Sequence, residues 1–307
     1  MAVSLQEVNG DLLARFRRQR PVRGGSLIVT LFGDAIMPRG GVIALRSLIQ
    51  LAALFGLNER LVRTATSRLA LDGWLEARRS RKLGEYQLSP SGRERFAEAT
   101  KRIYGEPHTP WTGRWTIVVL PELPALQRQK LTRELSWHGF GQLRAGIFAH
   151  PEVKLDDLDL GTWERKLPKN TLYFEASLSD ATEPQSLVAL GWDIAELGKR
   201  YQGFVDRYSR ALLALQAGKA APQAAFILRT LLIHEYRKLH LRDPLLPQRL
   251  LPASWPGTRA AVLCKEIYSR IFPASEAFLS ETAVRLDGRL PKGEPSVLKR
   301  FGGLSVT

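Results

Sequence analysis

The feature that most constrains the fold is a short helical stretch at residues 56–74, which has a defined start, a defined end and two different faces. Asn58 is a typical N-cap, because its side-chain oxygen can accept a hydrogen bond from a free backbone N–H group. Gly73 can end the helix in a left-handed conformation. The apolar side chains that follow helical spacing, and that we expect to be buried, are Leu61, Val62, Ala65 and Leu69.

The other face of this helix carries cationic and hydroxyl side chains at the spacing i, i+3, i+4 and i+7, namely Arg60, Arg63, Thr64 and Ser67. In a DNA major groove, arginine can bond guanine with two hydrogen bonds, and serine or threonine can reach a base edge or a phosphate. The face therefore suits a major groove. A solvated helix face with ordinary arginines is the alternative interpretation, and the helix alone does not decide between the two.

The charge of the whole chain favours a polyanionic partner. The 307 residues carry a formal net charge of +15. Such an excess favours nucleic acid, a membrane surface or a phosphorylated ligand. Residues 1–105 contain 18 Lys and Arg against 9 Asp and Glu, so most of the imbalance lies in the first third of the chain. The length is sufficient for two or three domains with cores of their own.

Several classes of protein are disfavoured by the sequence. No apolar run reaches membrane-spanning length, and the N-terminus lacks the pattern of a signal peptide. Cys264 is the only cysteine, so no intrachain disulfide can form, and we expect a cytoplasmic protein. His234 and His240 are six residues apart, whereas a zincin helix needs four. With no serine elbow, phosphate loop or paired-cysteine motif either, we expect no catalytic residues, no metal and no cofactor.

The order of elements in residues 24–105 is that of a winged helix-turn-helix domain. Three helices are expected, at residues 26–33, at residues 45–55 and in the stretch described above. A β-hairpin with a basic tip then follows at residues 74–88. The residues that we expect to contact DNA are Asn58, Arg60, Arg63, Thr64, Ser67, Arg68, Arg78, Arg79, Arg81 and Lys82. Residues 1–23, which are rich in arginine, are expected to form a basic N-terminal tail.

The rest of the chain completes an α+β protein. A strand, a helix and two further strands are expected at residues 111–120, 126–137, 142–148 and 171–176. This order predicts a ferredoxin-like α+β domain at residues 106–180. Its strand edges could pair with a second copy, so we expect a homodimer formed by this domain. Residues 181–286 predict a mainly helical C-terminal domain, and residues 287–307 a poorly ordered tail.

Ten short segments spread over nearly the whole chain occur in a specific order, at residues 26–32, 38–41, 58–64, 72–75, 111–115, 231–237, 241–244, 246–247, 251–252 and 255–257. In these segments the chain resembles the PaaX family of bacterial transcriptional repressors. The resemblance implies the three domains named above. It also implies a dimer that binds a pseudo-palindromic double-stranded operator, represses phenylacetate degradation genes and releases DNA on binding phenylacetyl-CoA.

The effector that the resemblance implies needs a pocket of mixed chemistry. An acyl-CoA carries several phosphate charges, an adenine and here an aromatic acyl end, so cationic and apolar side chains should line its site. The residues that we expect to form part of this pocket are Arg229, His234, Arg237, Arg242, Tyr236 and Trp255. The alternative is that these side chains serve the packing and salt bridges of the helical domain itself.

Two other classes of function stay open at this point. The central fold resembles that of CRISPR-adaptation endoribonucleases, which use an acidic residue after the first strand, and Glu122 holds that place here. A metal-dependent nuclease or an acyl-CoA-processing enzyme could thus be built on the central and C-terminal domains. However, Glu122 follows Pro121 without a second carboxylate nearby, which makes a poor metal site. A protein-interaction module would use the basic charge only for solubility.

Overall fold

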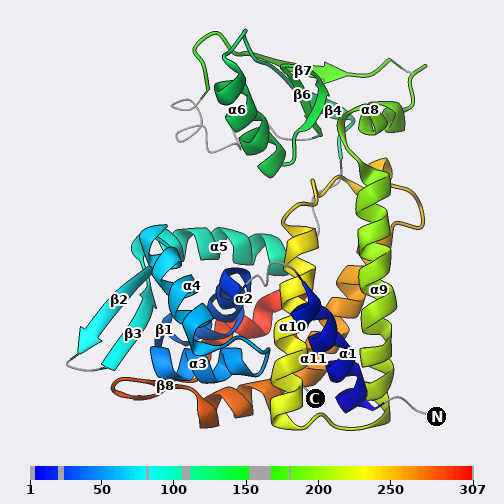
Figure 1. Cartoon of the computed structure of the whole chain (residues 1–307). Helices are drawn as coiled ribbons and strands as arrows, with labels where there is room; N and C mark the ends of the chain where they lie inside the picture. Colours follow the sequence, from blue (N-terminus) through cyan, green and yellow to red (C-terminus); the bar gives the residue numbers. More distant parts are fainter. Residues whose placement is uncertain are drawn as a thin grey trace. The chain divides into compact units, whose positions relative to one another are not determined.

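The chain folds into two compact units, which we describe separately from a computed structural model (Figure 1). The structure describes residues 4–19, 24–80, 83–105, 111–151, 167–179 and 181–305. Unit 1 combines Met1–Glu106, Gly203–Lys238 and Arg259–Thr307, and unit 2 combines Pro107–Gln202 and Leu239–Thr258. These units differ from the expected domains, because most of the helices of residues 181–286 share a unit with the N-terminal part of the chain.

The first half of unit 1 has the elements of a winged helix-turn-helix. Its elements are α2 (Gly24–Leu31), η1 (Phe32–Ile36), η2 (Met37–Arg39), β1 (Val42–Ala44), α3 (Leu45–Ala53), α4 (Glu59–Leu71), β2 (Leu75–Ser80), β3 (Leu83–Leu88) and α5 (Pro90–Tyr104). The strands form an antiparallel sheet in the order β1-β3-β2. The three helices and the hairpin agree with the expectation. The short strand β1 was not anticipated, and it follows a reversal in which Gly40 and Gly41 have φ of 92° and 74°.

The N-terminal residues differ from the tail that we expected. Residues Leu5–Arg18 form helix α1, which begins with a capping box between Ser4 and Glu7. The ring of Phe16 is buried and lies edge-on to Phe55 and His234, at centroid distances of 6.4 and 5.5 Å. The arginines of this segment therefore belong, at least up to residue 18, to a helix that packs on the core.

Long helices complete unit 1. They are α9 (Ile194–Ala217), α10 (Pro222–His240) and α11 (Pro256–Thr282), of which each contributes part of its length to unit 1. The portion of α10 in unit 1 is buried on nearly all sides, which is typical of a helix inside a core. Its Phe226 packs against Phe55 and Phe278, with centroids 6.2 and 5.1 Å apart. No helix in the described part of the chain is both long enough and apolar enough to cross a membrane.

The last described residues are ordered against unit 1, which corrects the prediction of a poorly ordered tail. They form the small hairpin β8 (Val284–Arg285) and β9 (Gly288–Arg289) and the helical segment η4 (Pro295–Gly302). Val297 and Arg300 are buried. The backbone N–H of Glu294 donates to the carbonyl of Pro38 at 2.8 Å, which ties this segment to the winged-helix elements.

Unit 2 contains a four-stranded antiparallel sheet of ferredoxin-like order, as predicted. Its elements are β4 (Arg114–Val119), α6 (Ala125–Trp137), β5 (Gly141–Arg144), β6 (Ile147–Pro151), β7 (Leu172–Ser177), α8 (Pro184–Gly191) and η3 (Gln248–Leu250). The strand order is β5-β6-β4-β7. The single strand expected at residues 142–148 is wrong, because the chain reverses there and forms β5 and β6, with Gly146 at φ 80° in the turn.

Each face of this sheet has an apolar core of its own. On one face, Leu131 and Leu135 of α6 pack with Val118 and Phe148 of the sheet. The second core contains Trp115, Ala149 and Val188, together with two leucines of the segment around η3, Leu246 and Leu250. The expected central domain is thus completed by residues from the loop that follows α10 in the sequence.

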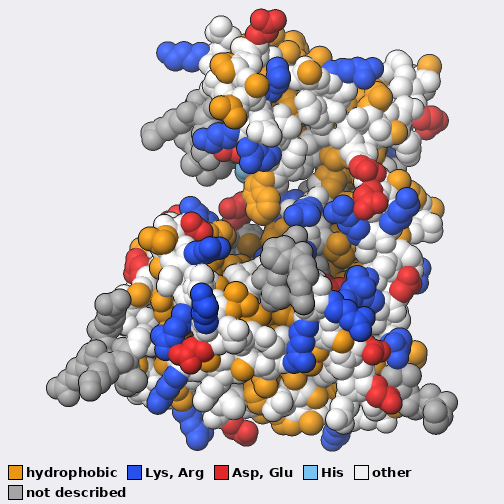
Figure 2. Space-filling view, in the orientation of Figure 1, with side chains coloured by type: hydrophobic (Ala, Val, Ile, Leu, Met, Phe, Trp, Pro, Cys, Tyr) orange, Lys and Arg blue, Asp and Glu red, His pale blue; other side chains and the backbone are white. Residues whose placement is uncertain are grey.

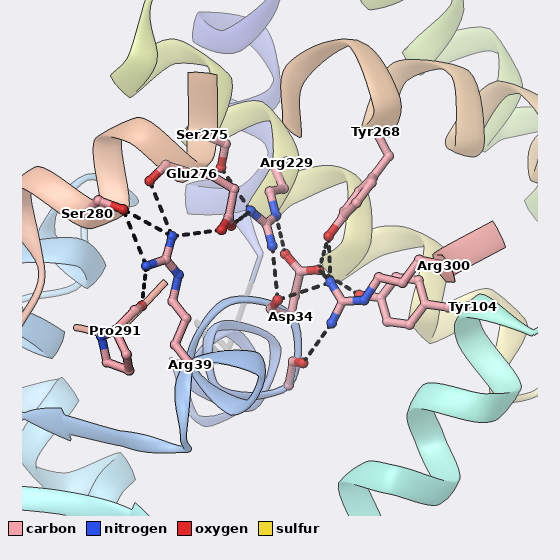
Figure 3. A network of polar contacts seen from close by, with 11 residues as sticks. Asp34, Arg39, Tyr104, Arg229, Tyr268, Ser275, Glu276, Ser280, Pro291 and Arg300 are labelled. Carbon is pink, nitrogen blue, oxygen red and sulfur yellow. Dashed lines mark hydrogen bonds and ion pairs between the residues drawn. The ribbon is translucent and has the colours of Figure 1, made fainter. Parts of the chain in front are cut away.

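A buried network of charges links the parts of unit 1 (Figure 3). Asp34 of η1 is 4% exposed and pairs with Arg229 of α10 and Arg300 of η4, each at 2.7 Å. The hydroxyl groups of Tyr104 and Tyr268 donate to the same carboxylate at 2.7 and 2.8 Å. One side chain of the winged-helix part therefore holds α5, α10, α11 and the C-terminal segment together.

Glu276 of α11 extends this network toward η2. One carboxylate oxygen of Glu276 pairs with Arg229 at 2.6 Å, and the other pairs with Arg39 at 2.7 Å. Arg39 also donates to the carbonyl of Pro291 at 2.7 Å. Removing one partner from a buried set of this kind leaves uncompensated charge, so we expect the network to be sensitive to single changes.

The geometry determines the protonation state of Asp34. Burial alone would raise the pKa of its carboxyl group, but Arg229, Arg300 and the hydrogen bond from Tyr104 outweigh burial and hold the pKa below its ordinary value. The carboxylate is therefore charged at neutral pH, where it balances part of the charge of the two arginines.

We expect Asp34→Asn to lower the free energy of unfolding by about 3–5 kcal/mol, because Arg300 then loses its buried counter-charge and Arg229 keeps only Glu276. Denaturant unfolding measures the change. Glu266→Gln is the control, since its pair with Arg270 is exposed and should change stability by less than about 1 kcal/mol. Equal losses in the two variants would contradict the assigned role of the network.

Stability should also depend on pH through Asp34. Because the folded pKa lies below the unfolded one, the carboxylate contributes fully above the unfolded pKa of about 4 and its contribution is lost as the pH falls through the folded pKa. Unfolding of the wild type should become easier in acid, and the difference between wild type and Asp34→Asn should shrink from pH 7 to pH 3. A difference that stays constant over this range would show that Asp34 does not titrate in this way.

Candidate nucleic-acid interface

Helix α4 is fixed at its first turn and along one side. Its N-cap is Asn58, whose side-chain oxygen accepts a hydrogen bond from the backbone N–H of Leu61 at 2.9 Å, as expected. Val62, Ala65 and Thr66 form the buried side of the helix. The burial of Thr66 was not anticipated, and it is possible because the threonine hydroxyl donates to the carbonyls of Val62 and Arg63, both at 3.0 Å.

The end of α4 is joined to α5 by a close contact. Gly73 has φ 73°, which agrees with the expected left-handed end of the helix. Its carbonyl accepts hydrogen bonds from the hydroxyl groups of Ser89 and Ser91, at 2.6 and 2.9 Å. Ser89 is also the N-cap of α5. A Cβ atom on Gly92 would lie 2.2 Å from the carbonyl oxygen of Trp74, so only glycine fits there. These contacts fix the direction of α4.

The outward face of α4 is exposed as predicted. Its exposed residues are Arg60, Arg63, Thr64, Ser67 and Arg68. Arg63 forms an exposed pair with Glu59 at 2.6 Å, and the hydroxyl of Thr64 donates to the carbonyl of Arg60 at 2.9 Å. Among the described residues, the side chains of Arg60, Ser67 and Arg68 have no hydrogen-bond or ion-pair partner. Figure 2 shows several Lys and Arg side chains on the surface over α4.

The hairpin β2–β3 is described only in part at its basic end. Arg78 is exposed and lies 3.9 Å from Glu85 of β3. The other carboxylate oxygen of Glu85 accepts a hydrogen bond from the backbone N–H of Leu286 at 3.0 Å, which ties the base of the hairpin to the C-terminal segment. Arg81 and Lys82 and the side chain of Arg79 lie outside the described residues, so their contact with DNA stays a prediction.

The exposed face of α4 can bind a polyanion with little loss of free energy from existing contacts. An exposed ion pair between residues four apart contributes only about 0.3–0.5 kcal/mol, so a phosphate can replace Glu59 as the partner of Arg63. Arg60 and Arg68 are available without breaking any pair. Arginine forms bidentate hydrogen bonds with phosphate or guanine, and hydroxyl groups can add contacts to either.

The six residues expected to bind an effector belong to both units, four to unit 1 and two to unit 2. Arg229 is held in the buried network with Asp34 and Glu276. Nδ1 of His234 lies 2.9 Å from the hydroxyl of Thr30, and Arg237 donates to the carbonyl of Ser26 at 2.7 Å.

Tyr236 is also buried in unit 1, whereas the other two residues belong to unit 2. There Arg242 is exposed and Trp255 packs against Tyr201. Burial lowers the pKa of Arg237 to about 10. Effector binding by these six residues stays a prediction, and sequence reasoning had no signal for the partners of Arg229 and Arg237, which lie about 200 residues away in the chain.

The hypothesis of a metal-dependent enzyme depends on Glu122 and on a group of metal-ligating side chains. Glu122 follows β4, as expected, and is exposed. Among the described residues, no group of three or more His, Cys, Asp and Glu side chains could hold a metal ion. Cys264 is buried, and burial raises the pKa of its thiol well above the ordinary value, so it is no ready nucleophile.

Three helices, an antiparallel hairpin and an outward cationic third helix are the features of a winged helix-turn-helix regulator. Sequence models of known families match three successive segments, with the descriptions "PaaX-like protein" at residues 23–92, "PaaX protein central Cas2-like domain" at residues 108–188 and "PaaX-like protein C-terminal domain" at residues 192–281. The chain is 37% identical to the transcriptional repressor PaaX of Escherichia coli (strain K12) over 291 residues, which cover 93% of this chain and 92% of the relative. The chain therefore belongs to the PaaX family of transcriptional repressors.

A solved structure adds a more distant likeness. The uncharacterized protein Rv0674 from Mycobacterium tuberculosis aligns with a TM-score of 0.49 and 22% sequence identity. The alignment covers 76% of this chain and 90% of that chain.

We expect Arg60→Ala with Arg68→Ala to weaken binding to duplex DNA and to reduce the slope of log affinity against log salt by about 2, since each lost phosphate contact removes about 0.9 from the slope. Fluorescence anisotropy over a series of salt concentrations measures both quantities. Arg128→Ala with Arg133→Ala removes two exposed arginines of α6 and is the matched control. An unchanged slope in the α4 variant would contradict the assignment of this face.

Proposed function

We propose that this chain is a cytoplasmic DNA-binding repressor of genes for phenylacetate degradation, and that phenylacetyl-CoA releases it from its operator. The observation that carries the proposal is the outward face of α4, where Arg60 and Arg68 have no partner among the described residues while the opposite side is buried. Membership of the PaaX family, with a relative named a transcriptional repressor, supports repression as the outcome of binding.

In this proposal the chain acts as a homodimer on a pseudo-palindromic operator. Two copies would place their α4 helices in successive major grooves, about 34–36 Å apart on the duplex. The sheet of unit 2 supports the dimer hypothesis, because β7 pairs on one side only among the described strands. Its side chains Leu172 and Phe174 are 55% and 49% exposed, so a second copy could cover apolar surface there.

Release of DNA requires two states of the protein with different affinity for the effector. The elements of the winged helix and parts of α9, α10 and α11 belong to one compact unit. Asp34 in that unit is bonded to residues of α5, α10, α11 and η4. A ligand that displaces any of these helices would therefore disturb the frame on which α4 is held, and DNA affinity would fall.

The effector is tested by titrating a complex of the protein with its operator, which is first selected from random duplex DNA. We expect phenylacetyl-CoA to raise the dissociation constant for DNA at least about fivefold, as is typical of a coupling energy of about 1–3 kcal/mol. Free phenylacetate should have no effect. If neither compound changes the affinity, the effector is a different molecule, and DNA binding by α4 is unaffected by that result.

A further inference from the structure

A groove on unit 1 lies between α1 and α9 and has a volume of about 620 Å³. Ligand sites commonly have volumes of about 300–1,000 Å³, so the groove is large enough for a small organic molecule. Its lining residues are Val8, Asp11, Leu12, Ala14, Arg15, Arg18, Asp206, Arg207 and Arg210. None of them was among the residues that we expected to bind an effector.

The lining of the groove carries more positive than negative charge. Four arginines face two aspartates in its lining. Arg210 pairs with Asp11 at 3.1 Å, and Arg207 pairs with Glu235, which lies outside the lining, at 2.9 Å. Arg15 and Arg18 are exposed on α1 and, among the described residues, have no hydrogen-bond or ion-pair partner. Two guanidinium groups one helical turn apart are therefore available to an anion.

Helix α1 presents these two arginines from a fixed position. The side chain of Asn9 donates to the carbonyl of Ala224 at 3.0 Å, and Arg17 donates to the carbonyl of Phe55 at 3.3 Å. Together with the buried ring of Phe16, these bonds attach the middle and the C-terminal end of α1 to the core. A ligand would thus meet a preformed pair of cations and would not have to order a mobile arm.

The groove also has apolar side chains beside its charged ones. Val8 and Leu12 are buried side chains of its wall. Such a lining suits a ligand that carries phosphates on an organic framework.

We propose that this groove binds the phosphate groups of a nucleotide-bearing ligand, with Arg15 and Arg18 as the anion-binding pair. Arginine holds phosphate through two parallel N–H···O bonds, and exposed guanidinium groups exchange water for phosphate oxygen readily. The identity of the ligand rests on the proposed function, under which it is the phosphorylated adenosine end of the acyl-CoA effector. The groove would then bind the adenosine phosphates of the effector through residues of α1 and α9. Helix α1 and part of α9 belong to unit 1, which also contains α4.

The test uses coenzyme A itself, which carries the phosphates without an acyl group, in calorimetric titrations of the full chain. Wild type should bind it, and Arg15→Glu with Arg18→Glu should weaken binding about 30-fold or more, since charge-assisted hydrogen bonds are lost and repulsion is added. Arg128→Glu with Arg133→Glu is the control of equal charge change on α6, and it should bind like the wild type. Both arginines of each pair are exposed, and thermal unfolding verifies that the variants are folded.

The possible outcomes separate the groove from the proposed function. If coenzyme A does not bind the wild type, or binds the α1 variant equally well, the groove is not the site. If it binds as predicted but phenylacetyl-CoA leaves DNA affinity unchanged, the groove stands and the proposed effector is wrong. If the α1 variant loses DNA affinity without any nucleotide present while coenzyme A binding is kept, DNA phosphates occupy the groove and the proposal is overturned.

Discussion

The rest of unit 1 depends on the buried carboxylate of Asp34. It accepts hydrogen bonds from Arg229, Arg300, Tyr104 and Tyr268, which come from four different elements. Burying an arginine costs free energy unless its charge is paired, so loss of one member of this cluster leaves an uncompensated buried charge. Asp34 lies in a π-helical turn directly after α2, and α2 is the helix on which α4 packs, as the close approach of Gly24 to Leu61 shows. The position of α4, the candidate DNA-binding helix, therefore depends on the ionic cluster around Asp34.

Structural features that depend on residues close together in the chain could be predicted from the sequence. Asn58 caps α4 because its partner Leu61 is three residues away, and the hairpin follows from alternation and turn residues. Features that depend on partners far apart in the chain could not be predicted in this way. The ion pair of Arg229 with Asp34 could not be predicted, because Asp34 lies 195 residues earlier in the chain. The last residues are ordered by Arg300, which no local pattern indicates. Helix α1 had a detectable signal, the capping box of Ser4 and Glu7 followed by Val8, Leu12 and Phe16 at helical spacing.

The same cluster bears on how a repressor of this family could be regulated. The winged-helix elements, the C-terminal segment and parts of α9, α10 and α11 share one compact unit, and the groove between α1 and α9 lies on that unit. A rigid core does not deform continuously, so binding in such a groove acts by favouring one of two discrete packings. Unit 2 has separate cores on the two faces of its sheet, which fits an independent task such as the proposed pairing of two copies.

The central claim is that the outward face of α4 lies against DNA. Photo-crosslinking tests it most directly, with a photoreactive amino acid placed at Ser67 on that face, at Thr66 on the buried side, and at Arg133 on α6 of unit 2. We predict covalent linkage to operator DNA from position 67 and none from positions 66 and 133. Absence of a crosslink at position 67 in a protein that still binds the operator would contradict the account.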